Sequence, residues 1–184
     1  MNIKNEYVKE TKLKDLVIID RPIRIDNRGF FREAVRISDL KDIGVDFVPV
    51  QVNHSLSEPN VIRALHAEQW NKLVYPVTGS IFIAIVDIRP ESETFGQIDT
   101  FNMSDNDRKL LYIPVGFANS ICVVGDEPVN YVYFVDQYYT GQDTRAIAWD
   151  DPDLAIDWPV KNPIISERDK NNPKLRDLFP DKYK

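Results

Sequence analysis

Hydrophobic residues in this sequence gather in short runs that are separated by turn residues. The runs are rich in Val, Ile, Tyr and Phe, and Gly, Pro, Asn and Asp lie between them. β-Branched and aromatic residues fit the pleated surface of a sheet, and runs bounded by turn residues are typical of strands. The pattern predicts strands within residues 15–20, 47–55, 72–89, 109–124 and 129–139.

Helical periodicity is much rarer along the chain. Two short stretches fit a helix: Ser38–Gly44, with Ser38 as its cap and Gly44 at its end, and residues 172–180. Many short strands without a long alternation of strands and helices favour an antiparallel sandwich or barrel. The sequence therefore predicts an all-β jelly roll with a few short peripheral helices.

Residues 1–184 are predicted to form a single domain, since no repeat, low-complexity segment or linker divides them. Residues 152–184 differ in composition, because their first part holds several prolines and alternates acidic with apolar residues. This segment is too short to bury a core of its own. We expect it to wrap over the barrel.

Charge and cysteine content exclude several classes of protein. The chain has 23 Lys and Arg against 29 Asp and Glu, a net charge of −6 that offers no footprint for a nucleic-acid backbone. The apolar-looking stretch 73–88 is interrupted by Pro, Gly and Asp and falls short of the ~20 residues of a membrane helix. Cys122 is the single cysteine, so no disulfide forms within the chain. We expect a cytoplasmic protein without nucleic-acid or membrane partners.

The chain has two histidines, His54 and His66. His66 and Glu68 form half of the ligand set of a cupin metal site, and no later histidine completes it, so we predict neither a metal nor another cofactor. Strand alternation would place Arg63 and His66 on opposite faces unless a bulge brings them together. On the residues alone, an ordinary charged surface strand and an active site both remain open.

Nine short motifs follow one another over roughly residues 10–175. They are DNRGFFRE (26–33), QVNHSLS (51–57), RALH (63–66), KLVYPVTGSIFIAIVDIR (72–89), SETFG (92–96), IPVGFAN (113–119), YVYFVDQYY (131–139), WDDPDLAIDWP (149–159) and ISERD (165–169). In type and order they resemble the dTDP-4-dehydrorhamnose 3,5-epimerase family of cupin-fold nucleotide-sugar epimerases. The resemblance implies a metal-free cupin jelly roll (a double-stranded β-helix barrel) that inverts carbons beside a C4 ketone.

The resemblance also assigns catalytic roles. His66 would be the base that removes a proton made acidic by the ketone, and Asp169 would orient its ring. Lys72 would stabilise the enolate oxygen, and Tyr133 would return a proton from the opposite face. A protein that only binds a nucleotide sugar has no need of all four residues, which disfavours a catalytically silent cupin. A metal-dependent cupin dioxygenase is disfavoured because the chain lacks the metal ligands. A 3,4-ketoisomerase stays a weaker alternative.

The family binds a nucleotide-diphosphate sugar, usually as a homodimer in which a swapped N-terminal strand completes the partner's site. Arginine forks suit the diphosphate, and aromatic rings suit the base. The residues that the resemblance assigns to substrate or nucleotide binding are Arg28, Phe31, Glu33, Gln51, Asn53, Arg63, Asn119, Tyr139 and Arg168.

The sequence departs from the family pattern around the expected pocket. RALH replaces RGLH, AEQW (67–70) follows His66 in place of the more usual aromatic and Gln pair, and the connection to Lys72 is shorter by a few residues. Asn119 replaces the histidine of GFAH, so a neutral amide lies where the family has an imidazole. These changes leave open which sugar is bound, whether dTDP, CDP or GDP carries it, and whether C3, C5 or both are inverted.

Overall fold

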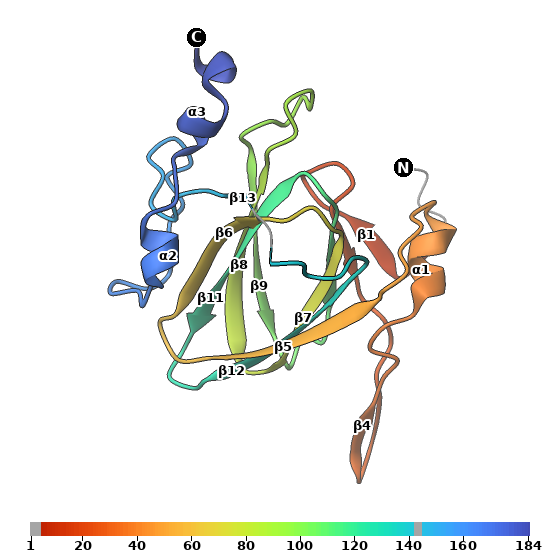
Figure 1. The fold of residues 1–184 in the computed structure, drawn as a ribbon. Coiled ribbons are helices and arrows are strands. Elements are labelled where there is room, and N and C mark those ends of the chain that lie inside the picture. Colours follow the sequence, from red (N-terminus) through yellow and green to blue (C-terminus); the bar gives the residue numbers. More distant parts are fainter. Residues whose placement is uncertain (1–4, 142–144) are drawn as a thin grey trace.

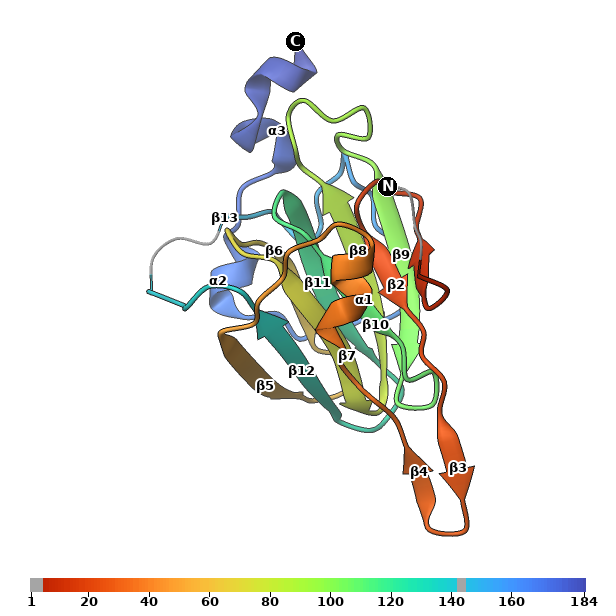
Figure 2. The same ribbon diagram turned by 90° about the vertical axis from the view of Figure 1, so that its right-hand side faces the viewer.

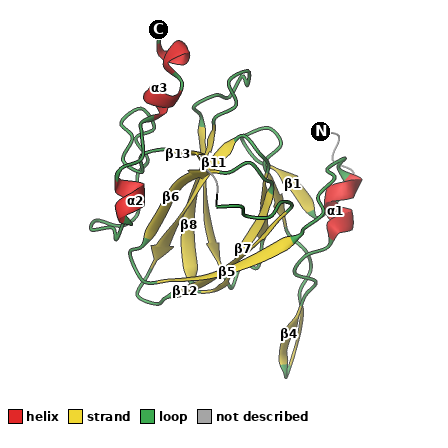
Figure 3. Ribbon diagram, in the orientation of Figure 1, coloured by secondary structure: helices red, strands yellow, loops and turns green. Residues whose placement is uncertain are grey.

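A computed structural model of the chain describes residues 5–141 and 145–184. Two antiparallel sheets face each other and form the barrel in Figure 1 and Figure 3. The first sheet has the order β1 (Val8–Glu10), β2 (Val17–Ile19), β10 (Leu110–Ile113), β7 (Lys72–Thr78), β12 (Val129–Val135), β5 (Gln51–Ser57). The second has the order β13 (Arg145–Ala146), β6 (Ile62–Ala67), β11 (Phe117–Val124), β8 (Ser80–Asp87), β9 (Ile98–Ser104).

The predicted all-β class is confirmed, and each of the five predicted runs overlaps at least one strand. The prediction missed β9, whose sequence IDTFNMS mixes apolar residues with Asp, Thr, Asn and Ser. It also missed the short edge strands β1 and β13 and the hairpin of β3 (Arg24–Asp26) and β4 (Gly29–Phe31). This hairpin projects away from the barrel in both views (Figure 1, Figure 2), so no alternating burial marks it.

Three short α-helices lie outside the barrel: α1 (Ile37–Asp42), α2 (Glu167–Lys170) and α3 (Leu175–Leu178). A 3-10 helix covers Pro180–Tyr183. The prediction of Ser38 as a cap is wrong, because α1 begins at Ile37 and no side chain caps it. Gly44 does follow the helix end, with a φ of 83° that glycine adopts readily. Among the described residues, no helix has the length and apolarity to cross a membrane.

The main core lies between the two sheets. Strand β8 shows how it forms, because Ile81, Ile83 and Ile85 point into the barrel while Phe82 and Val86 point outward. The outer faces of the two sheets are each covered by a different segment. Leu154 and Leu175 of the C-terminal segment pack on the β6–β11–β8 face, and Leu40 of α1 packs on the β7–β10–β2 face. In Figure 1 the C-terminal helices and α1 accordingly flank the barrel on opposite sides.

Candidate active site

A small cavity of about 130 Å³ opens into the barrel between the two sheets. Strands β5, β6, β7, β11 and β12 each contribute side chains to its wall. A larger cleft of about 320 Å³ adjoins it, and the two share Arg63 and His66. The polar residues in the wall of the small cavity include Arg63, His66, Glu68, Lys72, Asn119 and Tyr133.

A bulge in β6 brings Arg63 and His66 to the same cavity. Asn119 of β11 pairs with His66, whereas Ile121 pairs with Arg63, so β6 uses one residue more than β11 over this span. The extra residue breaks the alternation of the strand. Ala64 and Leu65, between the two polar residues, both pack in the outer core. The bulge that the sequence analysis required is thus present.

His66 forms a pair with Asp169 of α2. The ring Nε2 lies 3.0 Å from the Asp169 Oδ1, and the Asp169 backbone N–H donates to the Ser166 hydroxyl that caps the helix. Burial raises the pKa of Asp169, but the hydrogen bond and charge of His66 outweigh it, and the pKa lies below its usual value. Asp169 is therefore ionised at neutral pH and holds the imidazole in place.

Lys72 lies at the centre of a buried polar cluster. Its ammonium pairs with the Glu68 carboxylate and donates to the Asn119 Oδ1 at 3.1 Å. The Asn119 amide donates in turn to the Glu68 Oε2 at 2.8 Å and to the His66 carbonyl. Side-chain exposure is 7% for Lys72 and 9% for Glu68. Every member of the cluster thus has a partner, as buried polar groups require.

The electrostatics of this cluster follow from burial and the ion pair. Burial lowers the pKa of Lys72, and the Glu68 carboxylate opposes that effect. For Glu68, burial would raise the pKa, but the charge of Lys72 and the hydrogen bonds from Lys72 and Asn119 bring it below its usual value. Glu68 therefore carries its negative charge at neutral pH.

Tyr133 of β12 faces the same cluster, with its ring centroid 5.1 Å from the Lys72 Nζ. The neighbouring Tyr131 ring lies 5.7 Å away. Burial, and next the charge of Glu68, raise the pKa of Tyr133. Its hydroxyl stays protonated at neutral pH and can give up a proton to a stronger base.

The residues expected to bind the nucleotide fall into two groups. In the first group Arg63 lies in the cavity wall, where its Nε donates to the Ser57 hydroxyl at 2.9 Å, and Arg168 lines the adjoining cleft. Gln51 donates to Asn53 at 2.8 Å and accepts from the Tyr139 backbone at 3.2 Å. These contacts place the three on the β5–β12 side, where Ser55 of β5 lines the cavity.

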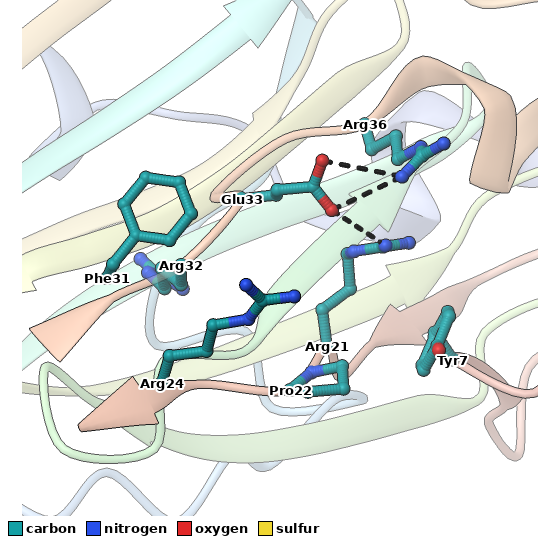
Figure 4. Close-up of a pocket in the computed structure, with 8 residues that line it drawn as sticks. All are labelled: Tyr7, Arg21, Pro22, Arg24, Phe31, Arg32, Glu33 and Arg36. Carbon is teal, nitrogen blue, oxygen red and sulfur yellow. Dashed lines mark hydrogen bonds and ion pairs between the residues drawn. The ribbon is translucent and has the colours of Figure 1, made fainter.

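The second group, Arg28, Phe31 and Glu33, does not line the His66 cavity of its own chain. Arg28 is 86% exposed on the hairpin and pairs with Asp26. Phe31 and Glu33 line a separate cavity of about 460 Å³ near the base of the hairpin. Figure 4 shows that cavity, in which Glu33 accepts from two arginines and two more arginines contribute to the wall. Its residues are Tyr7, Arg21, Pro22, Arg24, Phe31, Arg32, Glu33 and Arg36.

Glu68 is the residue of this site that the sequence analysis missed. It was considered only as half of a metal-ligand pair, and among the described residues no group of three His, Cys, Asp or Glu could hold a metal ion. The signal that could have found it is its spacing, two residues after His66 and four before Lys72. A four-residue connection between β6 and β7 keeps all three residues at one end of the barrel.

Two antiparallel sheets around a central cavity define the class: the chain is a cupin-type jelly roll. The profile of the dTDP-4-dehydrorhamnose 3,5-epimerase family matches residues 10–177. The chain therefore belongs to this family and is an enzyme of the isomerase class.

Individual relatives agree with this assignment. The chain is 37% identical over 175 residues to the dTDP-4-dehydrorhamnose 3,5-epimerase of Shigella flexneri, which covers 92% of this chain and 96% of that protein. A dTDP-6-deoxy-D-glucose-3,5-epimerase from Legionella pneumophila, solved with dTDP-4-keto-L-rhamnose, has a TM-score of 0.88 at 32% identity and covers 95% of each chain. A 3'-monoepimerase variant from Streptomyces bikiniensis, solved with dTDP, has a TM-score of 0.87 at 25% identity and covers 93% of this chain and 88% of that one.

Proposed function

We propose that this enzyme inverts C3, C5 or both carbons of a dTDP-linked 4-keto-6-deoxy sugar, as a step in deoxysugar biosynthesis. One observation carries the proposal: His66, which pairs with Asp169, lines one cavity together with Lys72 and Tyr133. Relatives solved with dTDP or a dTDP-sugar support dTDP as the nucleotide. The single cysteine, Cys122, is buried and free, which fits action in the reducing cytoplasm.

His66 begins the proposed reaction. It accepts the proton from the carbon beside the ketone, and the electrons of the broken C–H bond move to the C4 oxygen to form an enolate. The Asp169 carboxylate stabilises the imidazolium that results. The Lys72 ammonium, whose side chain is largely buried, donates to the enolate oxygen.

Tyr133 completes the inversion. Its hydroxyl gives a proton to the carbon from the ring face opposite to His66, and the enolate electrons return to form the new C–H bond. The raised pKa of Tyr133 keeps this proton available at neutral pH. Both residues line one cavity from different strands, β6 and β12, so a sugar ring between them would meet one on each side.

Two regions would bind the rest of the substrate. Arg63, in the cavity wall and shared with the adjoining cleft, would hold the diphosphate, with Arg168 in that cleft as a further contact. Gln51, Asn53 and Tyr139 would contact the base on the β5–β12 side. Asn119 would meet the sugar from the pocket wall.

We also propose a homodimer in which the partner's N-terminal hairpin completes the site. The hairpin exposes Ile25, Phe30 and Phe31, and the region of β5 exposes Val50, Val52 and Leu56. Apolar side chains exposed together commonly mark a protein contact. Docking a partner's hairpin at the open end of the cavity would supply Arg28, Phe31 and Glu33 to the nucleotide.

The proposal predicts that the pure enzyme, incubated in D2O with dTDP-4-keto-6-deoxy sugars, incorporates deuterium at C3, C5 or both. His66→Asn should lower the exchange rate by about 10²–10⁴-fold, because the base is lost, while dTDP binding stays close to that of the wild type. Mass spectrometry and NMR measure the exchange. Exchange that persists in His66→Asn would show that another residue is the base, and a wild type without exchange that still binds dTDP would favour the silent cupin.

Removal of the Tyr133 hydroxyl should separate deprotonation from inversion. Tyr133→Phe should still exchange with solvent through His66 but give at least about 10²-fold less inverted product, because the donor on the far face is missing. Tyr183→Phe, in the C-terminal 3-10 helix, is the matched control. NMR of the product measures how much of it is inverted. A Tyr133→Phe enzyme that inverts normally would exclude Tyr133 as the proton donor.

A shared site predicts complementation between two inactive variants. In a dimer of one His66→Asn chain and one Arg28→Ala chain, one of the two sites combines an intact His66 with an intact Arg28. Co-expression of differently tagged chains should therefore yield a heterodimer more active than either homodimer. A heterodimer no more active than the mean of the two homodimers would contradict the swapped arrangement.

A further inference from the structure

Glu68 is the one carboxylate in the wall of the small cavity among the described residues. It lies in the connection between β6 and β7, and each of its oxygens has a different protein partner. Oε1 accepts from the Lys72 ammonium and Oε2 accepts from the Asn119 amide. Its side chain is almost as deeply buried as that of the lysine beside it.

The geometry of Lys72 gives Glu68 such a role. An ammonium has three N–H donors. Glu68 takes one and the Asn119 Oδ1 takes a second, so the protein uses two of the three donors and fixes the direction of the third. The ammonium lies beside the Tyr133 ring, where the proposed proton donor also stands. Two fixed contacts therefore convert a flexible side chain into a directed single donor.

Glu68 and Asn119 also contact each other: the Asn119 amide donates to the Glu68 Oε2 at 2.8 Å. Both partners of the Lys72 ammonium are thus held by a direct bond between them. The negative charge of Glu68 balances Lys72, and the neutral Asn119 adds no competing positive charge.

We propose that Glu68 is the positioning residue of Lys72: its carboxylate keeps the ammonium protonated and aims its remaining N–H at the C4 oxygen of the sugar. This inference rests on the proposed epimerase function. Asn119 completes the arrangement as an uncharged bridge between Glu68 and the β6 backbone at His66. The fixed donor favours a substrate that presents a carbonyl oxygen to this wall, and the bound carboxylate disfavours an anionic group there.

The pH dependence of the reaction rate should report the protonation of Lys72, which the charged and titratable groups around it control. Burial lowers the pKa of Lys72, and the charge of Glu68 is the largest opposing influence. Without that charge the pKa of Lys72 falls further. Because only the protonated lysine has the third N–H donor and the positive charge that stabilise the enolate, the rate falls as the pH rises through the pKa of Lys72. The groups that share the cavity wall with Lys72 are Glu68 from the connection, Arg63 and His66 from β6, Asn119 from β11, and Tyr131 and Tyr133 from β12.

The test compares Glu68→Gln with Glu68→Asp and with Glu127→Gln, an exposed glutamate in the turn before β12. Glu68→Gln should lower kcat by up to about 100-fold, the effect of a small misplacement of a catalytic group. The alkaline limb of its pH–rate profile should move to lower pH. Glu68→Asp keeps the charge, so its limb should stay near that of the wild type while kcat is reduced, and Glu127→Gln should match the wild type in both.

A second measurement needs no substrate. In protein labelled with ¹³Cε-lysine, the Lys72 resonance, assigned by its absence from Lys72→Met, should titrate at lower pH in Glu68→Gln than in the wild type. Unchanged titration together with an unchanged pH–rate profile would overturn the role of Glu68 even if the wild type is an epimerase. If the wild type exchanges no substrate proton, the proposed function fails, and the role in aiming Lys72 at C4 fails with it. If Glu68→Gln does not fold, the Glu68→Asp variant replaces it. An alkaline limb of its pH–rate profile that is shifted to lower pH would equally contradict the proposal.

Discussion

One extra residue in β6 decides which side chains meet in the barrel. A regular strand would send Arg63 and His66 to opposite faces, and one of them would be lost from the cavity. The bulge opposite β11 lets both point inward, while Ala64 and Leu65 between them stay in the outer core under the C-terminal segment. The bulge therefore keeps apolar side chains on the outer face of β6 and brings the two polar side chains to the cavity.

The second constraint is the burial of charge. A lysine and a glutamate that are both less than a tenth exposed are costly to bury unless each is paired and hydrogen-bonded. Here the pair is completed by Asn119 and is anchored on β6, β7 and β11. Lys72 and Asn119 lie on strands, which hold such a cluster more accurately than loops do, and their contacts fix Glu68 in its connection. On this account, the buried Lys72–Glu68 pair is costly, but it leaves one N–H of Lys72 in a fixed direction beside His66 and Tyr133.

The strands were largely predictable because their signal is local. Runs such as 72–89 carry the β-branched residues and turn residues that define strands wherever they fold. The bulge was not predictable, since it depends on how β6 pairs with β11. The His66–Asp169 contact joins residues 103 positions apart, and only the resemblance to a family connected them. Glu68 was overlooked because its meaning depends on Asn119, 51 positions later.

A crystal structure with dTDP-xylose, a sugar nucleotide without the reactive ketone, would test the central claim most directly. The claim is that the bulge in β6 unites phosphate binding and proton transfer in one site. The account predicts that the diphosphate lies within hydrogen-bonding distance of Arg63 and that the sugar lies between His66 and Tyr133, with its C4 oxygen toward Lys72. A sugar bound away from His66, or a nucleotide held by the arginines around Glu33 without contact to Arg63, would contradict it.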